Sequence, residues 1–248
     1  MPRNLAIDIG NTRCKIGDGE NIAAVSHEEF LTALRYSTAG QETVHWWVAS
    51  VNHPMYQAFQ TWVLHHRPHD EITFLNWKTI PIETAVEFPE RVGSDRLLAA
   101  VAANRLRTPG RPAIVVDLGT ALKVDLIDEN GVFQGGAIGP GLRMSAHALY
   151  QGTDALPELD VQPLLEEKNV RRNLSPVGRN THDAMEAGLY WGIVGAIREL
   201  VSQTSRSLSQ TPDRFITGGG AGTVCQSLCD AFVHVPEMVM RGIFEIMP

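Results

Sequence analysis

Short apolar runs bounded by glycine, asparagine or threonine recur in both halves of the chain. Runs of this length with these boundaries are typical of buried β-strands. In the first half they predict a strand at 4–9, a turn at Gly10-Asn11-Thr12, a returning strand at 13–16, and strands at 43–51 and 71–75. In the second half they predict strands at 113–117, 122–127, 132–138 and 214–217.

Longer segments with a mixed apolar and polar pattern predict helices at 53–66, 93–106, 181–208 and 221–231. The residues 108–112, with two prolines and a glycine, separate a predicted helix from a predicted strand and indicate a boundary. We therefore expect an α/β protein with an N-terminal lobe, 1–108, and a C-terminal lobe, 109–248.

One segment occurs twice, with a single gap, near the start of each predicted lobe. Asp8-Ile9-Gly10-Asn11-Thr12-Arg13-Cys14-Lys15 aligns with Asp117-Leu118-Gly119-Thr120-Ala121-Leu122-Lys123. Repeats of 20 to 50 residues indicate solenoids, whereas this spacing is near half the chain and indicates a duplicated lobe. We expect the two acidic turns to face each other across a cleft.

Each turn contains the residue types that phosphate binding requires. Asp8 and Asp117 end predicted strands, where a carboxylate can hold Mg²⁺ directly or through water. Gly10 and Gly119 allow the backbone to approach a phosphate closely, and neighbouring hydroxyl, amide and N–H groups can bind its oxygens. A single turn of this kind also fits an ordinary hairpin. The duplication and a third glycine-rich turn at 217–220 favour phosphate binding, and the absence of a Walker A pattern argues against a P-loop enzyme.

Gly93-Ser94-Asp95-Arg96 opens a predicted helix and has two interpretations. Ser94 and Asp95 suit the first helical turn, so the segment can be a simple cap. Alternatively, Asp95 accepts a proton from an attacking hydroxyl and Arg96 binds a substrate carboxylate with two hydrogen bonds.

Composition restricts the partners. The 248 residues carry a net charge of −7, which argues against nucleic acid or an anionic membrane as a partner. The three cysteines, Cys14, Cys225 and Cys229, give no disulfide framework and are interpreted as core thiols in a reducing compartment. We expect a cytoplasmic protein.

The motifs at 8–15, 92–96, 117–125, 135–141, 180–188 and 217–219 together resemble the type III pantothenate kinases in order and spacing, over nearly the whole chain. The resemblance implies two ribonuclease-H-like lobes of the actin-like/sugar-kinase ATPase fold and a homodimer. It also implies ATP-dependent phosphorylation of pantothenate, the first step of coenzyme A synthesis, with Mg²⁺ and a monovalent cation, K⁺ or NH₄⁺.

The resemblance also implies roles for individual residues. It makes Asp95 the proton acceptor, Asp117 the monovalent-cation ligand and Asp8 a candidate Mg²⁺ ligand. Pantothenate contacts fall on Gly93, Ser94, Asp95 and Arg96, and on Thr181 across the dimer. ATP contacts fall on Asp8, Ile9, Gly10, Asn11, Thr12, Arg13, Cys14, Lys15 and Thr120.

Two positions depart from the family pattern. Lys123 stands where the family has threonine, and its ammonium can contact phosphate, occupy the monovalent-cation position, or reach solvent from an edge strand. Val86 stands where the family often has a tyrosine near pantothenate. Two alternative functions remain: a kinase of the same fold for another acceptor, such as a sugar, and a nucleotide-binding regulator without turnover.

Overall fold

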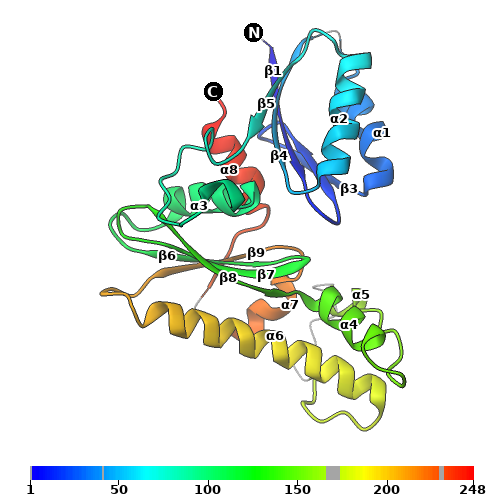
Figure 1. Cartoon of the computed structure of the whole chain (residues 1–248), viewed down its shortest axis with the longest axis vertical. Helices are drawn as coiled ribbons and strands as arrows, with labels where there is room; N and C mark the ends of the chain where they lie inside the picture. Colours follow the sequence, from blue (N-terminus) through cyan, green and yellow to red (C-terminus); the bar gives the residue numbers. More distant parts are fainter. Residues whose placement is uncertain (1, 41, 166–173, 229–231) are drawn as a thin grey trace. The chain divides into compact units, whose positions relative to one another are not determined.

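The computed structural model describes residues 2–40, 42–165, 174–228 and 232–248, which form two compact units. Unit 1 comprises Met1–Arg105 and Met238–Pro248, and unit 2 comprises Leu106–Glu237 (Figure 1). The second lobe expected from the sequence spans 109–248, whereas the chain returns to unit 1 at Met238.

Unit 1 is built on a five-stranded mixed sheet in the order β3-β2-β1-β4-β5. Its strands are β1 (Arg3–Ile9), β2 (Cys14–Gly17), β3 (Ile22–Val25), β4 (Val44–Ser50) and β5 (Glu71–Leu75). The pairs β1–β2 and β2–β3 are antiparallel, whereas β1–β4 and β4–β5 are parallel.

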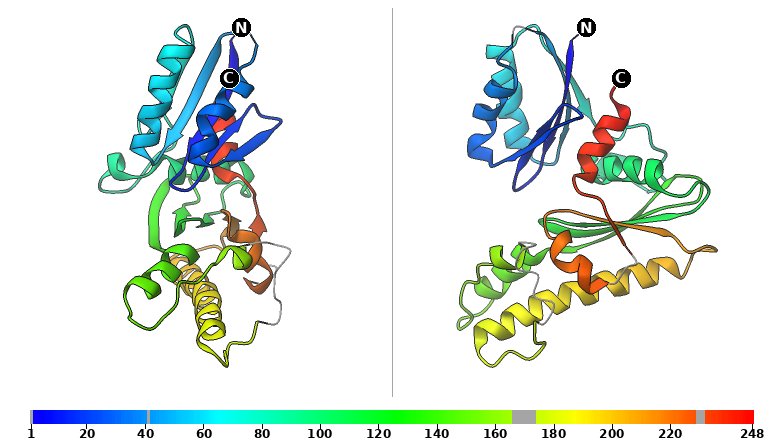
Figure 2. Two further views of the ribbon diagram at one scale, coloured as in Figure 1. Left: turned by 90° about the vertical axis from the view of Figure 1, so that its right-hand side faces the viewer. Right: turned by 180° about the vertical axis from the view of Figure 1, so that it is seen from behind.

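Helices cover both faces of this sheet (Figure 2). They are α1 (His27–Ser37), α2 (His53–His66), α3 (Ser94–Leu106) and α8 (Met238–Ile246), with a 3₁₀ turn, η1 (Pro89–Arg91). The buried Phe30 of α1 and Phe59 of α2 share one core cluster with Trp46 of β4. On the other face, α8 contacts β1. A Cβ at Gly242 of α8 would lie 2.0 Å from the Leu98 carbonyl oxygen of α3, so these helices pack backbone against backbone.

Unit 2 repeats the sheet of unit 1. Its order, β10-β9-β6-β7-β8, is the same arrangement when β6 is matched to β1, β7 to β2 and β9 to β4. The strands are β6 (Ala113–Leu118), β7 (Ala121–Ile127), β8 (Phe133–Pro140), β9 (Asp213–Thr217) and β10 (Val233–His234). The duplication predicted from the two acidic turns is therefore confirmed at the level of strand connectivity.

The helices of unit 2 share one core cluster with the second sheet, and the long helix α6 runs along that sheet (Figure 1). They are α4 (Leu142–Gln151), α5 (Gln162–Leu165), α6 (Thr181–Ser205) and α7 (Ala221–Cys225), followed by the 3₁₀ turn η3 (Gln226–Leu228). Cys229 and the end of the helix predicted at 221–231 lie outside the described residues. Among the helices that the structure describes, none has the length and apolar character that a membrane span requires.

Candidate functional site

The first acidic turn joins β1 to β2, and we call residues 3–17 hairpin 1. The Gly10 N–H donates to the Arg13 carbonyl at 3.1 Å and closes the turn. Asp8 pairs directly across the strands with Lys15, and their Oδ2 and Nζ atoms are 3.8 Å apart. The side chains of Asn11 and Thr12 are exposed at the tip, so this hairpin combines a carboxylate, an ammonium and an open turn.

Two residues of hairpin 1 turn away from that tip. Ile9 and Cys14 are fully buried in the core cluster of unit 1. Burial raises the pKa of the Cys14 thiol to about 12, and the nearby Asp8 carboxylate adds to the rise. Any nucleotide contact of these two residues therefore has to come from the backbone.

The segment 93–96 lies at the same edge of the first sheet. The Val51 N–H donates to the Ile9 carbonyl at 3.1 Å, which joins the carboxyl ends of β1 and β4. The Ser94 hydroxyl donates to the Ser50 carbonyl at 3.4 Å and ties the start of α3 to that edge. Unit 1 therefore brings the acidic turn and the 93–96 segment together, as is common for ligand sites at the carboxyl ends of parallel strands.

Asp95 is held against the first turn of α3. Its Oδ1 accepts from the Arg96 N–H at 2.9 Å, and the same N–H lies 3.1 Å from the Gly93 carbonyl. A Cβ at Gly93 would stand 2.4 Å from Asp95 Oδ1, so glycine is needed for this carboxylate position. The contact with the Arg96 N–H orients the half-buried Asp95 carboxylate within the first turn of the helix.

His27 is a site neighbour that the sequence analysis did not identify. It is the first residue of α1, and its Nε2 lies 3.0 Å from the carbonyl oxygen of Gly10. A signal was available, because Ser26 and Glu29 form a capping box that fixes the start of this helix. The contact with Gly10 is long-range, however, and only the fold shows it.

The second acidic turn joins β6 to β7, and we call residues 113–127 hairpin 2. The Gly119 N–H donates to the Ala121 carbonyl at 3.1 Å, so this turn is one residue tighter than that of hairpin 1. Asp117 pairs directly across the strands with Lys123, and their Oδ2 and Nζ atoms are 2.7 Å apart. Thr120 is exposed at the tip.

Two further glycine turns meet hairpin 2. The Gly220 N–H donates to the Leu118 carbonyl at 2.9 Å, and the Gly141 N–H donates to the Thr120 carbonyl at 3.2 Å. Gly218 has a φ of 93°, and a Cβ there would lie 2.5 Å from both the Leu118 carbonyl oxygen and Asp117 Oδ1. The third glycine-rich turn recognised in the sequence therefore lies beside Asp117, and only glycine fits at its closest point.

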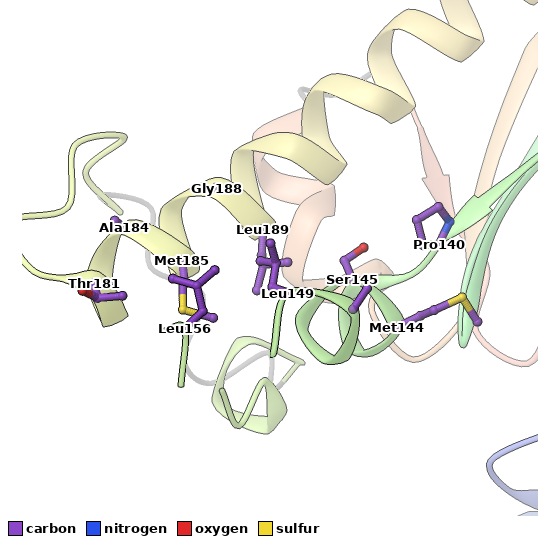
Figure 3. A pocket seen from close by; sticks show the side chains of 11 residues that line it. Pro140, Met144, Ser145, Leu149, Leu156, Thr181, Ala184, Met185, Gly188 and Leu189 are labelled. Atoms are coloured by element: carbon purple, nitrogen blue, oxygen red, sulfur yellow. The ribbon is translucent and has the colours of Figure 1, made fainter. Parts of the chain in front are cut away.

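Thr181 is set apart from these turns. It is the first residue of α6, whose N-cap Asn180 accepts from the Asp183 N–H at 2.9 Å. It lines an open, largely apolar pocket of about 900 Å³ between α4 and α6. Figure 3 shows Thr181 at one end of that pocket and Pro140, the cross-strand partner of Ala121, at the other.

Solved structures identify the fold. A candidate Baf family transcriptional activator from Campylobacter jejuni superposes with a TM-score of 0.61 at 20% identity, covering 98% of this chain and 96% of that one. A candidate 2-dehydro-3-deoxygalactonokinase from Sinorhizobium meliloti gives 0.57 at 12% identity, with coverage of 98% and 97%. At these identities the likeness bears on the fold alone, which is that of the actin-like/sugar-kinase ATPases, as expected from the sequence.

The family follows from sequence comparison. Residues 4–203 match the family model of type III pantothenate kinase. A protein from Agathobacter rectalis named type III pantothenate kinase is 27% identical over 263 aligned positions, which cover 96% of this chain and 94% of that protein. The chain belongs to the type III pantothenate kinase family.

Proposed function

We propose that this protein phosphorylates pantothenate with ATP, the first step of coenzyme A synthesis. Membership of the family supports the reaction. The main structural support is that the Asp8–Gly10 turn and the 93–96 segment lie at the same edge of the first sheet. The Val51–Ile9 and Ser94–Ser50 hydrogen bonds hold them there. A phosphoryl donor and an acceptor alcohol need such adjacent sites.

ATP binding is proposed for both acidic turns. In hairpin 1 the contacts are Asp8 through Lys15, with Ile9 and Cys14 contributing only backbone groups because their side chains are buried. In hairpin 2 the contact is Thr120, which is exposed and whose backbone carbonyl accepts from the Gly141 N–H. Lys15 supplies positive charge for the phosphates.

The donors around Asp8 fit Mg²⁺. The carboxylate is at a strand end, beside exposed turn residues that can leave room for the water ligands that Mg²⁺ retains. The ion, when bound, would neutralise charge on the transferring phosphate. The Lys15 ammonium lies 3.8 Å from Asp8 Oδ2 and would stand beside the bound ion.

Asp95 is the proposed proton acceptor. The pantothenate hydroxyl oxygen bonds to the γ-phosphorus, the bond from that phosphorus to the bridging oxygen breaks, and ADP leaves with the electron pair. The hydroxyl proton passes to the Asp95 carboxylate late in the transfer. Gly93, Ser94 and Arg96 bind the rest of pantothenate, with Arg96 suited to its carboxylate.

We also propose a cytoplasmic homodimer in which Thr181 of one protomer contacts pantothenate bound to the other. The exposure of Thr181 at the end of an open apolar pocket supports this role. Neither nucleic acid nor a membrane is proposed as a partner, in line with the net charge of −7.

A coupled ADP-release assay with Mg·ATP tests the proposal. Turnover should require pantothenate and should not occur with a panel of sugars or sugar acids. Turnover with a sugar alone would assign another acceptor to the same fold. Tight ATP binding without turnover on any acceptor would instead support the nucleotide-binding regulator.

A further inference from the structure

Hairpin 2 contains a closer ion pair than hairpin 1. Lys123 Nζ donates to Asp117 Oδ2 at 2.7 Å, and both side chains are largely shielded, at 17% and 18% exposed. A distance of this size is that of a strong, charge-assisted hydrogen bond. The ammonium is therefore a fixed part of the turn.

Strand pairing explains why Lys123 points at Asp117. The two residues are directly opposite in the antiparallel pair β6–β7, and opposite residues share a face of the sheet. β7 is paired on both sides, with β6 and with β8. The edge-strand interpretation, in which Lys123 reaches solvent, is therefore wrong.

The other oxygen of Asp117, Oδ1, lies beside the Gly218 backbone. The Gly218 backbone approaches Oδ1 so closely that a Cβ there would lie 2.5 Å away. A dissolved cation at Asp117 would have to share the carboxylate with the Lys123 ammonium, which repels it. The donors at Asp117 thus do not fit a second monovalent cation beside Lys123.

We propose that the Lys123 ammonium is the permanent counter-ion of Asp117. A kinase with a neutral residue at this position would need K⁺ or NH₄⁺ to supply that single positive charge. A carboxylate beside a triphosphate repels it unless a cation balances the charge. An ammonium at 2.7 Å provides that balance in every molecule at any potassium concentration. Given the pantothenate kinase activity proposed above, turnover in this protein should be independent of monovalent cations.

The first measurement is the rate of ADP release as K⁺ or NH₄⁺ replaces tetramethylammonium at constant ionic strength. The wild-type rate should change less than about twofold. In Lys123→Thr, which removes the ammonium and leaves space and a hydroxyl, the rate without K⁺ should fall at least about tenfold and recover as K⁺ is added. Stimulation of the wild type by about tenfold or more would overturn the proposal.

Two matched variants sharpen the test. Lys123→Met removes the charge but keeps a side chain in its place, so its rate should fall and K⁺ should not restore it. Lys78→Thr removes an exposed lysine in unit 1 that lies over the Trp77 ring, so it changes net charge equally. The turnover rate of Lys78→Thr and its response to K⁺ should match those of the wild type. If they changed as much as in Lys123→Thr, the effect would come from net charge and not from the position of Lys123.

A second readout does not depend on turnover. The Tm of the wild type should be the same in K⁺ and tetramethylammonium, whereas the Tm of Lys123→Thr should rise with K⁺ alone. If the wild type turned over no pantothenate in any cation, the proposed function would fail, and the two melting curves would still decide the role of Lys123. A K⁺-dependent Tm in the wild type would count against that role.

Discussion

Hairpins 1 and 2 are both antiparallel strand pairs joined by a glycine turn, but their charged side chains are arranged differently. Each pairs an aspartate at the end of its first strand with a lysine on the returning strand, Asp8 with Lys15 and Asp117 with Lys123. The gap between carboxylate and ammonium is 3.8 Å in hairpin 1 and 2.7 Å in hairpin 2. Duplication therefore preserved strand register while the ion pair changed.

The neighbours of the two hairpins differ as well. Beside hairpin 1, the end of β4 holds the start of α3 through the Ser94–Ser50 contact, which brings the Asp95 carboxylate to the same sheet edge. Hairpin 2 meets the backbone of Gly218 and Gly141. The first edge therefore brings together the carboxylates of Asp8 and Asp95, whereas at the second edge a glycine backbone lies against Asp117, which is paired with Lys123.

The largest effect is expected from Asp95→Asn, which removes the carboxylate in the first turn of α3. kcat should fall by about 10²- to 10⁴-fold, the usual contribution of a positioned acid or base. The affinity for ATP should change little, because the amide oxygen can still accept from the Arg96 N–H. Steady-state kinetics and calorimetric ATP titration measure both, and equal losses in both would make Asp95 a structural cap.

The next effect concerns the close approach in unit 2. Gly218→Ala should lower the free energy of unfolding by at least about 2 kcal/mol, since a φ of 93° is strained for alanine and the new Cβ would meet the Leu118 carbonyl oxygen. Gly219→Ala is the matched control, because a Cβ there meets nothing within 4 Å. Urea unfolding compares the two variants. Equal stability would mean that the Gly218 turn can move away from Asp117.

Local patterns were sufficient to predict the hairpins and their duplication. β1 and β6 are each a run of mostly consecutive buried residues followed by a glycine turn, a signal contained within a few residues. The helix at 93–106 was also recognised, and α3 begins at Ser94. The family motifs identified candidate site residues, whose roles remain predictions.

Elements that depend on distant partners were not predicted. α8 returns to unit 1 because its buried face, including Met240 and Ile243, packs there and Gly242 lies against Leu98 of α3, a pairing far apart in the chain. α4 lacks a side-chain cap, so its start at Leu142 has little local signal. The placement of Lys123 depends on β7 being an inner strand, which only the complete sheet reveals.

A smaller effect should separate the two ion pairs. Lys123→Met leaves the shielded Asp117 carboxylate without its closest donor and should cost on the order of 2 kcal/mol of folding stability. Lys15→Met breaks a 3.8 Å contact and should cost about 1 kcal/mol or less, while raising the KM for ATP. Urea unfolding of both variants measures the difference. Equal costs would mean that the two distances do not report different interaction strengths.

The smallest expected signal comes from Cys14, which occupies the place that Leu122 has in hairpin 2. Burial raises the pKa of its thiol from 9.0 to about 12, so the folded state holds this proton more tightly than the unfolded state does. The resulting stability is complete below pH 9 and is lost as the pH rises towards 12. At pH 8 iodoacetamide should therefore leave Cys14 unmodified in the folded protein and alkylate it in urea, as read by peptide mass spectrometry. Rapid alkylation without urea would show that hairpin 1 opens in solution. The longer Asp8–Lys15 distance would then result from a less stable hairpin and would give no support to a metal site at Asp8.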